Sequence, residues 1–146
     1  MKVTRCNIML SATVTIIVLA SLFVGGQAGT LAEEKVALDT LFASLGGLSG
    51  LWTISTGWNT PGPDPCSYHG VTCSTATSDG LNHVTAVSLP SNGLTGTLPD
   101  TAAAWNLVEL KRLDLSTNAI SGSLPAAIGS LSRLEHLNFG VFPMPT

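Results

Sequence analysis

Residues 110–125 read LKRLDLSTNAISGSLP, and residues 84–99 read VTAVSLPSNGLTGTLP. The two stretches share the same spaced pattern of apolar residues, one asparagine, one glycine and a closing Leu-Pro pair, and a third unit begins within residues 134–139 before it stops. Asn92 and Asn118 therefore lie 26 residues apart at equivalent places. Self-similarity at a period of this length indicates a repeat architecture, in which each unit packs against its neighbours along the chain.

Each unit begins with the alternation of a short strand. Leu113 and Leu115 face inward, and the residues that alternate with them face the opposite side. Leu137 follows Leu113 by 24 residues, so the third unit keeps the register although the return arm of the first unit is two residues longer. The positions expected on the outer face of these strands are Ala86, Ser88, Arg112, Asp114, Ser116, His136 and Asn138.

The second half of each unit carries residues with architectural roles. Asn92 and Asn118 stand where the chain turns inward, and an amide side chain both donates and accepts hydrogen bonds there. Gly96 and Gly122 permit the bend that follows. Leu124, followed by proline, is expected to close the second coil against the core, as its equivalent does in the first unit.

The segment from residue 30 to residue 45 is predicted to be a helix. Thr30 and Glu33 form a capping box, and Glu33 and Glu34 suit the positive end of the helix dipole. Gly46 and Gly47 end the helix. A core-facing stripe at helical spacing consists of Leu38, Leu41, Phe42 and Leu45.

The chain opens with the features of a secretory signal peptide, predicted at residues 1–28. Lys2 and Arg5 precede an uncharged apolar stretch at residues 8–24, and Gly26 and Ala28 supply small side chains before the cleavage site. An uncleaved membrane anchor is the alternative, because the stretch approaches the roughly 17–25 residues that span a bilayer. No second apolar stretch of that length follows, so no membrane span is expected after the leader.

Removing the leader leaves four basic against nine acidic side chains, a formal charge of −5. An acidic chain without a basic cluster offers little to a phosphate backbone, so nucleic acid is not an expected partner. Only Cys66 and Cys73 remain after the leader, and an even pair in a secreted or surface-exposed protein predicts a disulfide. The prolines of residues 61–65 make this part of the chain a loop, and Trp52, Trp58 and Tyr68 are the large side chains available to pack around the bridge.

The repeated units resemble the plant-type leucine-rich repeat, L-x-x-L-x-L-x-x-N-x-L-x-G-x-[IL]-P. Residues 64–73, DPCSYHGVTC, are similar to the N-terminal cap of that family, with Tyr68 where the cap usually has tryptophan. The resemblance implies an α/β fold: a right-handed solenoid with a parallel sheet on its concave face and a helical cap closed by a Cys66–Cys73 disulfide. The implied domains are a signal peptide (1–28), a cap (29–82), two complete repeats and one partial repeat (83–140) and an uncapped tail (141–146).

The resemblance also implies a non-catalytic binding module outside the cell, with a protein, a peptide or a carbohydrate on the seven outer strand positions. The residues themselves offer no competing chemistry. His69, His83 and His136 are scattered, with no partner at metal-ligand spacing, and no catalytic motif or cofactor site is found. His136 is the histidine of interest, because its register places it beside Arg112, Asp114 and Asn138 on the outer face.

The third unit departs from the pattern. Phe142 stands where the repeat spacing requires asparagine, and residues 141–146 contain no capping structure. Stacks generally need about three or more units and a polar end. Two alternatives follow: the chain is a truncated piece of a larger receptor, receptor kinase or surface adhesion protein without a function of its own, or the apolar end docks another protein.

Overall fold

The structure, a computed structural model, describes residues 31–62, 64–77 and 79–140. The predicted leader, the Thr30 cap, Phe142 and the tail lie outside these residues. The helix and strands of the described part are α2 (Leu31–Ser44), β1 (Val71–Ser74), β2 (His83–Ser88), β3 (Thr95–Thr97), β4 (Arg112–Asp114), β5 (Ala119–Ser121) and β6 (His136–Asn138). Short 3-10 helices are η1 (Gly47–Ser49), η2 (Pro65–Ser67), η3 (Ala102–Trp105) and η4 (Ala126–Ser130).

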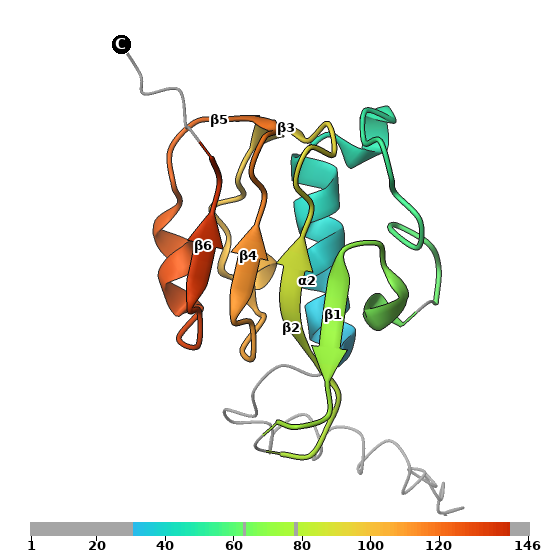
Figure 1. Ribbon diagram of the computed structural model, residues 1–146, viewed down its shortest axis with the longest axis vertical. Helices are drawn as coiled ribbons and strands as arrows, with labels where there is room; N and C mark the ends of the chain where they lie inside the picture. The colour runs from blue at the N-terminus through green and yellow to red at the C-terminus, as the bar shows by residue number, and fades with distance from the viewer. Residues whose placement is uncertain (1–30, 63, 78, 141–146) are drawn as a thin grey trace, which may run out of the picture.

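The repeated strands form one sheet, in the order β1-β2-β4-β6 (Figure 1). β2, β4 and β6 are parallel, with Val87 beside Leu113 and Leu113 beside Leu137. The register read from the repeats is therefore confirmed, including the change from 26 to 24 residues. β1 is an addition that the sequence did not predict: it pairs antiparallel with β2, because the short connection between them cannot make a parallel crossover of a dozen or more residues.

A second, two-stranded parallel sheet joins β3 to β5, with Gly96 beside Ile120. The bends at Gly96 and Gly122 have φ of 92° and 87°, as the repeat pattern predicted. A Cβ at Gly96 would lie 2.4 Å from the carbonyl oxygen of Ser44 at the end of α2. Glycine is thus required at this position both for its backbone conformation and for the close approach of the chain to the helix.

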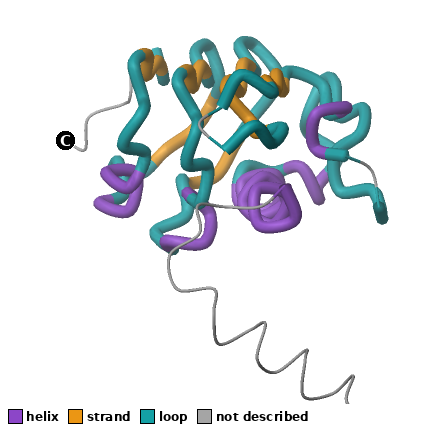
Figure 2. The backbone as a smooth tube through the Cα atoms, turned by 90° about the horizontal axis from the view of Figure 1, so that it is seen from below, coloured by secondary structure: helices purple, strands orange, loops and turns teal. Residues whose placement is uncertain are grey.

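Helices cover one side of the sheet and leave the other side open. Figure 2 shows the sheet strands along one side of the molecule and the helices along the other. The predicted stripe of α2 is confirmed, since Leu38, Leu41, Phe42 and Leu45 are all buried, and the fully buried Trp105 of η3 extends the core. In the part of the chain that the structure describes, no helix has both the length and the apolar character to cross a bilayer.

The aromatic residues expected in the loop-rich segment pack together against α2. Trp52 meets Phe42 edge-on with ring centroids 4.8 Å apart, and Trp58 lies 5.0 Å from Trp52 and 5.1 Å from Tyr68. The indole nitrogens donate to backbone carbonyls, Trp52 to Leu45 at 2.7 Å and Trp58 to the residue after Tyr68 at 2.9 Å. This cluster gives residues 49–70 a small core made of the three aromatic side chains that the sequence analysis named, together with Phe42 of α2.

At the β6 end of the stack, the expectation that Leu124 packs against the core is wrong. Leu98 is buried, but Leu124, its equivalent in the second unit, is 48% exposed. Leu124 therefore does not close its coil against the core, because within the described residues no third coil lies beside it. Leu137 of the edge strand β6 is 42% exposed for the same reason. Apolar side chains and a strand edge both face outward at this end.

Candidate functional site

The outer strand positions lie together on the side of the sheet away from α2. Strand pairing sets Arg112 beside His136 and Asp114 beside Asn138. These four residues and Leu113 line a shallow depression of about 220 Å³. The expected neighbourhood of His136 is thus found in the structure. The remaining outer positions, Ala86, Ser88 and Ser116, are half-buried.

Asp114 is held in its charged form on this face. Its Oδ1 accepts a hydrogen bond from the backbone N–H of Ser116 at 3.0 Å. Hydrogen bonds with Ser116 lower the pKa of Asp114 below its usual value, and contacts with Asn138 and the charge of Arg112 act in the same direction. Near neutral pH the face therefore presents a cation and an anion on one strand, flanked by an imidazole and an amide.

The two repeat asparagines form a ladder of backbone hydrogen bonds. Asn118 accepts through Oδ1 from the backbone N–H groups of Asn92 (2.9 Å) and Leu94 (3.0 Å), and its Nδ2 donates to the carbonyls of Leu89 and Leu115 at 2.8 Å. Asn118 thereby links the two coils as well as bracing its own.

Asn92 makes the corresponding contacts one coil earlier. Its side chain accepts from the backbone N–H of Ile54 at 2.8 Å and donates to the carbonyl of Ile54 at 2.9 Å. The residues preceding the two asparagines, Ser91 and Thr117, share a left-handed backbone with φ of 51° and 56°. Asn92 thus connects the first coil to the segment before it, in the architectural role that the sequence predicted.

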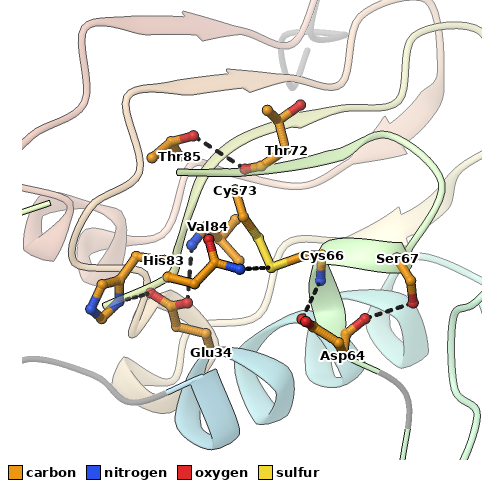
Figure 3. Close-up of a disulfide and its surroundings, with 10 residues drawn as sticks. Glu34, Asp64, Cys66, Ser67, Thr72, Cys73, His83, Val84 and Thr85 are labelled. Atoms are coloured by element: carbon orange, nitrogen blue, oxygen red, sulfur yellow. Dashed lines mark hydrogen bonds and ion pairs between the residues drawn. A yellow bond between two sulfur atoms is a disulfide. The ribbon is translucent and has the colours of Figure 1, made fainter. Parts of the chain in front are cut away.

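The predicted disulfide is present. Cys66 and Cys73 are bonded, with their Cα atoms 5.5 Å apart, and the bond joins η2 to β1 (Figure 3). Asp64 caps η2 by accepting from the backbone N–H of Cys66 at 2.9 Å. Asn82 donates from Nδ2 to the Cys66 sulfur at 3.2 Å. The bridge is therefore tied to the chain that leads into β2.

The sequence analysis missed one buried polar group. Glu34, assigned to the helix dipole, is fully buried: its Oε1 lies 2.9 Å from Nδ1 of His83, and its Oε2 accepts from the backbone N–H of Val84 at 3.0 Å (Figure 3). His83, for which the sequence predicted no partner at metal-ligand spacing, is 1% exposed, and its Nε2 lies 2.9 Å from Oδ2 of Asp79. Glu34 and His83 are 49 residues apart, so no local spacing could have indicated the pair.

The comparisons with known proteins agree with this geometry. The leucine-rich-repeat N-terminal domain matches residues 31–74, which contain α2 and the disulfide, and the leucine-rich repeat matches residues 109–131. The chain is a plant-type leucine-rich-repeat protein. Among curated relatives of this leucine-rich-repeat chain, the probable inactive receptor kinase RLK902 of Arabidopsis thaliana is 37% identical over 104 residues, which are 71% of this chain and 14% of that protein. The chain therefore spans a small part of the length of this relative.

Two solved leucine-rich-repeat ectodomains from Arabidopsis thaliana are similar in fold. The BIR2 ectodomain is 28% identical with a TM-score of 0.57, and the match covers 73% of this chain and 54% of that one. The ectodomain of the receptor kinase GASSHO1/SCHENGEN3 is 29% identical with a TM-score of 0.52, over 72% of this chain and 12% of that one. The latter was solved in complex with CASPARIAN STRIP INTEGRITY FACTOR 2.

Proposed function

We propose that this leucine-rich-repeat chain is a non-catalytic binding module that works outside the cell and contacts a protein or peptide through the outer face of β2, β4 and β6. The observation that carries the proposal is the pairing of Arg112 with His136 and of Asp114 with Asn138 on adjacent parallel strands. Side chains on paired strands keep fixed relative positions, so both charges are presented to a partner without a large ordering cost. The bound factor in the similar GASSHO1/SCHENGEN3 ectodomain supports a partner of this class.

In this proposal the chain has two working parts. Residues 29–82 are an N-terminal cap, and residues 83–140 are repeats that wind as a right-handed solenoid with the binding face on its concave side. The cap supplies β1, which covers the first edge of the sheet and leaves β2 paired on both sides. Residues 1–28 direct the chain out of the cell, where the Cys66–Cys73 disulfide is stable.

A charge-swap variant tests the binding face. The full chain is immobilised and exposed to secreted proteins from its source organism, and captured proteins are quantified by mass spectrometry. Exchanging the charges with Arg112→Asp and Asp114→Arg should abolish capture of the specific partner. Asp100→Lys is the matched control, because Asp100 is exposed outside the four-stranded sheet. Equal capture by the swap variant and the unmodified chain would rule out this face.

A second candidate rests on the exposed Leu124 and Leu137. We propose that the face beyond β6 accepts a further coil, so that the described residues are the first part of a longer receptor ectodomain. Both leucines occupy positions whose equivalents, Leu98 and Leu113, are buried by the next coil. Transcripts that continue in frame past Thr146 into more repeats would support this reading. Transcripts with a stop codon at that point would exclude it.

A further inference from the structure

The group formed by Glu34, His83 and Asp79 joins three parts of the chain. Glu34 comes from the first turns of α2, His83 begins β2, and Asp79 lies in the turn before β2. Glu34 has no exposed surface, the His83 side chain is 2% exposed, and the Asp79 side chain is 39% exposed. One end of the group is therefore sealed in the core, and the other end reaches water.

Both ring nitrogens of His83 face carboxylate oxygens at 2.9 Å. An imidazolium has two N–H donors and satisfies both carboxylates, whereas a neutral ring has one N–H and turns a lone pair toward the other carboxylate. Burial opposes the charged ring, but hydrogen bonds and charge from Glu34 and Asp79 outweigh it, and the pKa of His83 is raised from 6.5. The arrangement thus favours the doubly protonated ring.

The carboxylates of Glu34 and Asp79 differ in how well each tolerates losing its hydrogen bond from the His83 ring. Burial raises the pKa of Glu34, and a buried carboxylate deprived of its donor carries a large desolvation penalty. Hydrogen bonds from the backbone of Leu81 and from His83 hold the pKa of Asp79 at about 2, so Asp79 stays charged. Since Asp79 can turn to solvent and Glu34 cannot, the remaining proton belongs on Nδ1, facing Glu34.

The other charged side chain near this group is Glu109, which precedes β4 and adds to the rise in the pKa of Glu34. Glu109 is itself paired with Arg133 at 3.0 Å. No basic side chain of the described residues is paired with Glu34 or Asp79, so the imidazolium is the cation of this group.

We propose that Glu34, His83 and Asp79 form a latch controlled by one proton. In mild acid the doubly protonated His83 bonds both carboxylates and so holds the turn of residues 79–82 against α2. When His83 loses its Nε2 proton, its bond to Asp79 breaks while its bond to Glu34 remains. The latch is also connected to the disulfide of the cap, because Asn82 of the same turn donates a hydrogen bond to the Cys66 sulfur. The repeats beyond β2 keep their contacts in both states. This regulation is independent of the proposed binding face.

Histidine NMR on the isotope-labelled full chain tests the latch. The ring nitrogens of His83 should titrate with a pKa above 6.5, and the neutral ring should carry its proton on Nδ1. A pKa at or below 6.5, or a neutral ring protonated on Nε2, would overturn the proposal. His83→Gln assigns the resonances by removing one of three histidine signals.

Backbone amide exchange, corrected for the intrinsic rate at each pH, tests the release itself. The N–H of Leu81, bonded to Asp79 at 2.9 Å, should lose protection by about tenfold as His83 deprotonates. The N–H of Ser116 is a matched control, because Asp114 holds it at 3.0 Å across the same two-residue spacing, in the repeats whose contacts stay the same in both states. Asp79→Asn should lower the His83 pKa. Unchanged Leu81 protection across the titration, or an unchanged His83 pKa in Asp79→Asn, would contradict the latch.

Discussion

Replacing Asn118 with alanine removes the side chain that links the two complete coils. The change leaves the backbone N–H groups of Asn92 and Leu94 without their acceptor and two carbonyls without a donor. An unsatisfied buried amide costs about 1–3 kcal/mol. Because Asn118 is half-buried, water replaces part of the loss, and we expect the free energy of unfolding to fall by about 2–4 kcal/mol.

Urea unfolding followed by tryptophan fluorescence measures this loss, because Trp52, Trp58 and Trp105 are all buried. The unfolding midpoint of Asn118→Ala should drop by more than about 1 M. Asn138→Ala is the control: Asn138 is exposed and its Oδ1 accepts one local hydrogen bond, so its effect should stay within about 0.5 kcal/mol. Equal midpoints for the two variants would refute the view that Asn118 joins the coils.

Three further results are expected. Gly96→Ala should lower the free energy of unfolding, measured in urea, by more than about 1 kcal/mol, because the residue has a φ of 92° and its Cβ would clash with the Ser44 carbonyl. Gly129→Ala is the control, because a Cβ there meets open space. Equal effects of the two changes would argue against the close approach of Gly96 to Ser44. Reducing the disulfide should lower the free energy of unfolding by roughly 2 kcal/mol, and an unchanged urea midpoint in reductant would contradict a structural role. The pKa of His83 is raised above 6.5 in the folded chain, so its stabilisation is complete below pH 6.5 and is lost as pH rises through the folded-state pKa. The urea midpoint should therefore fall as pH rises above 6.5 in the unmodified chain and fall less in His83→Gln, and equal falls in the two would contradict this role of His83.

The repeats could be predicted from the sequence because their information is local. The alternation around Leu113 and the spacing to Leu137 predicted which strands pair and in which register. The same alternation identified Arg112 and His136 as neighbours on the outer face. Their role in binding stays a prediction, since the position of a side chain on a surface does not determine its ligand.

The features that sequence reasoning missed depend on contacts between distant segments. Glu34 looked like an ordinary first-turn acid, and only the packing of α2 on β2 shows that it is buried against His83. Leu124 matched the core pattern, but burial requires a neighbouring coil, which a repeat motif does not guarantee. β1 escaped notice because its four residues lie in a segment rich in glycine, serine and threonine.

The pairing of successive coils can be measured most directly by nuclear Overhauser contacts between backbone protons of neighbouring strands. We predict contacts that place Val87 beside Leu113 and Leu113 beside Leu137, all in parallel orientation. A register displaced by one residue would turn the leucines toward solvent and the charged residues toward the core. Contacts showing such a displacement, or no contact between β2 and β4, would contradict the stacked-coil structure.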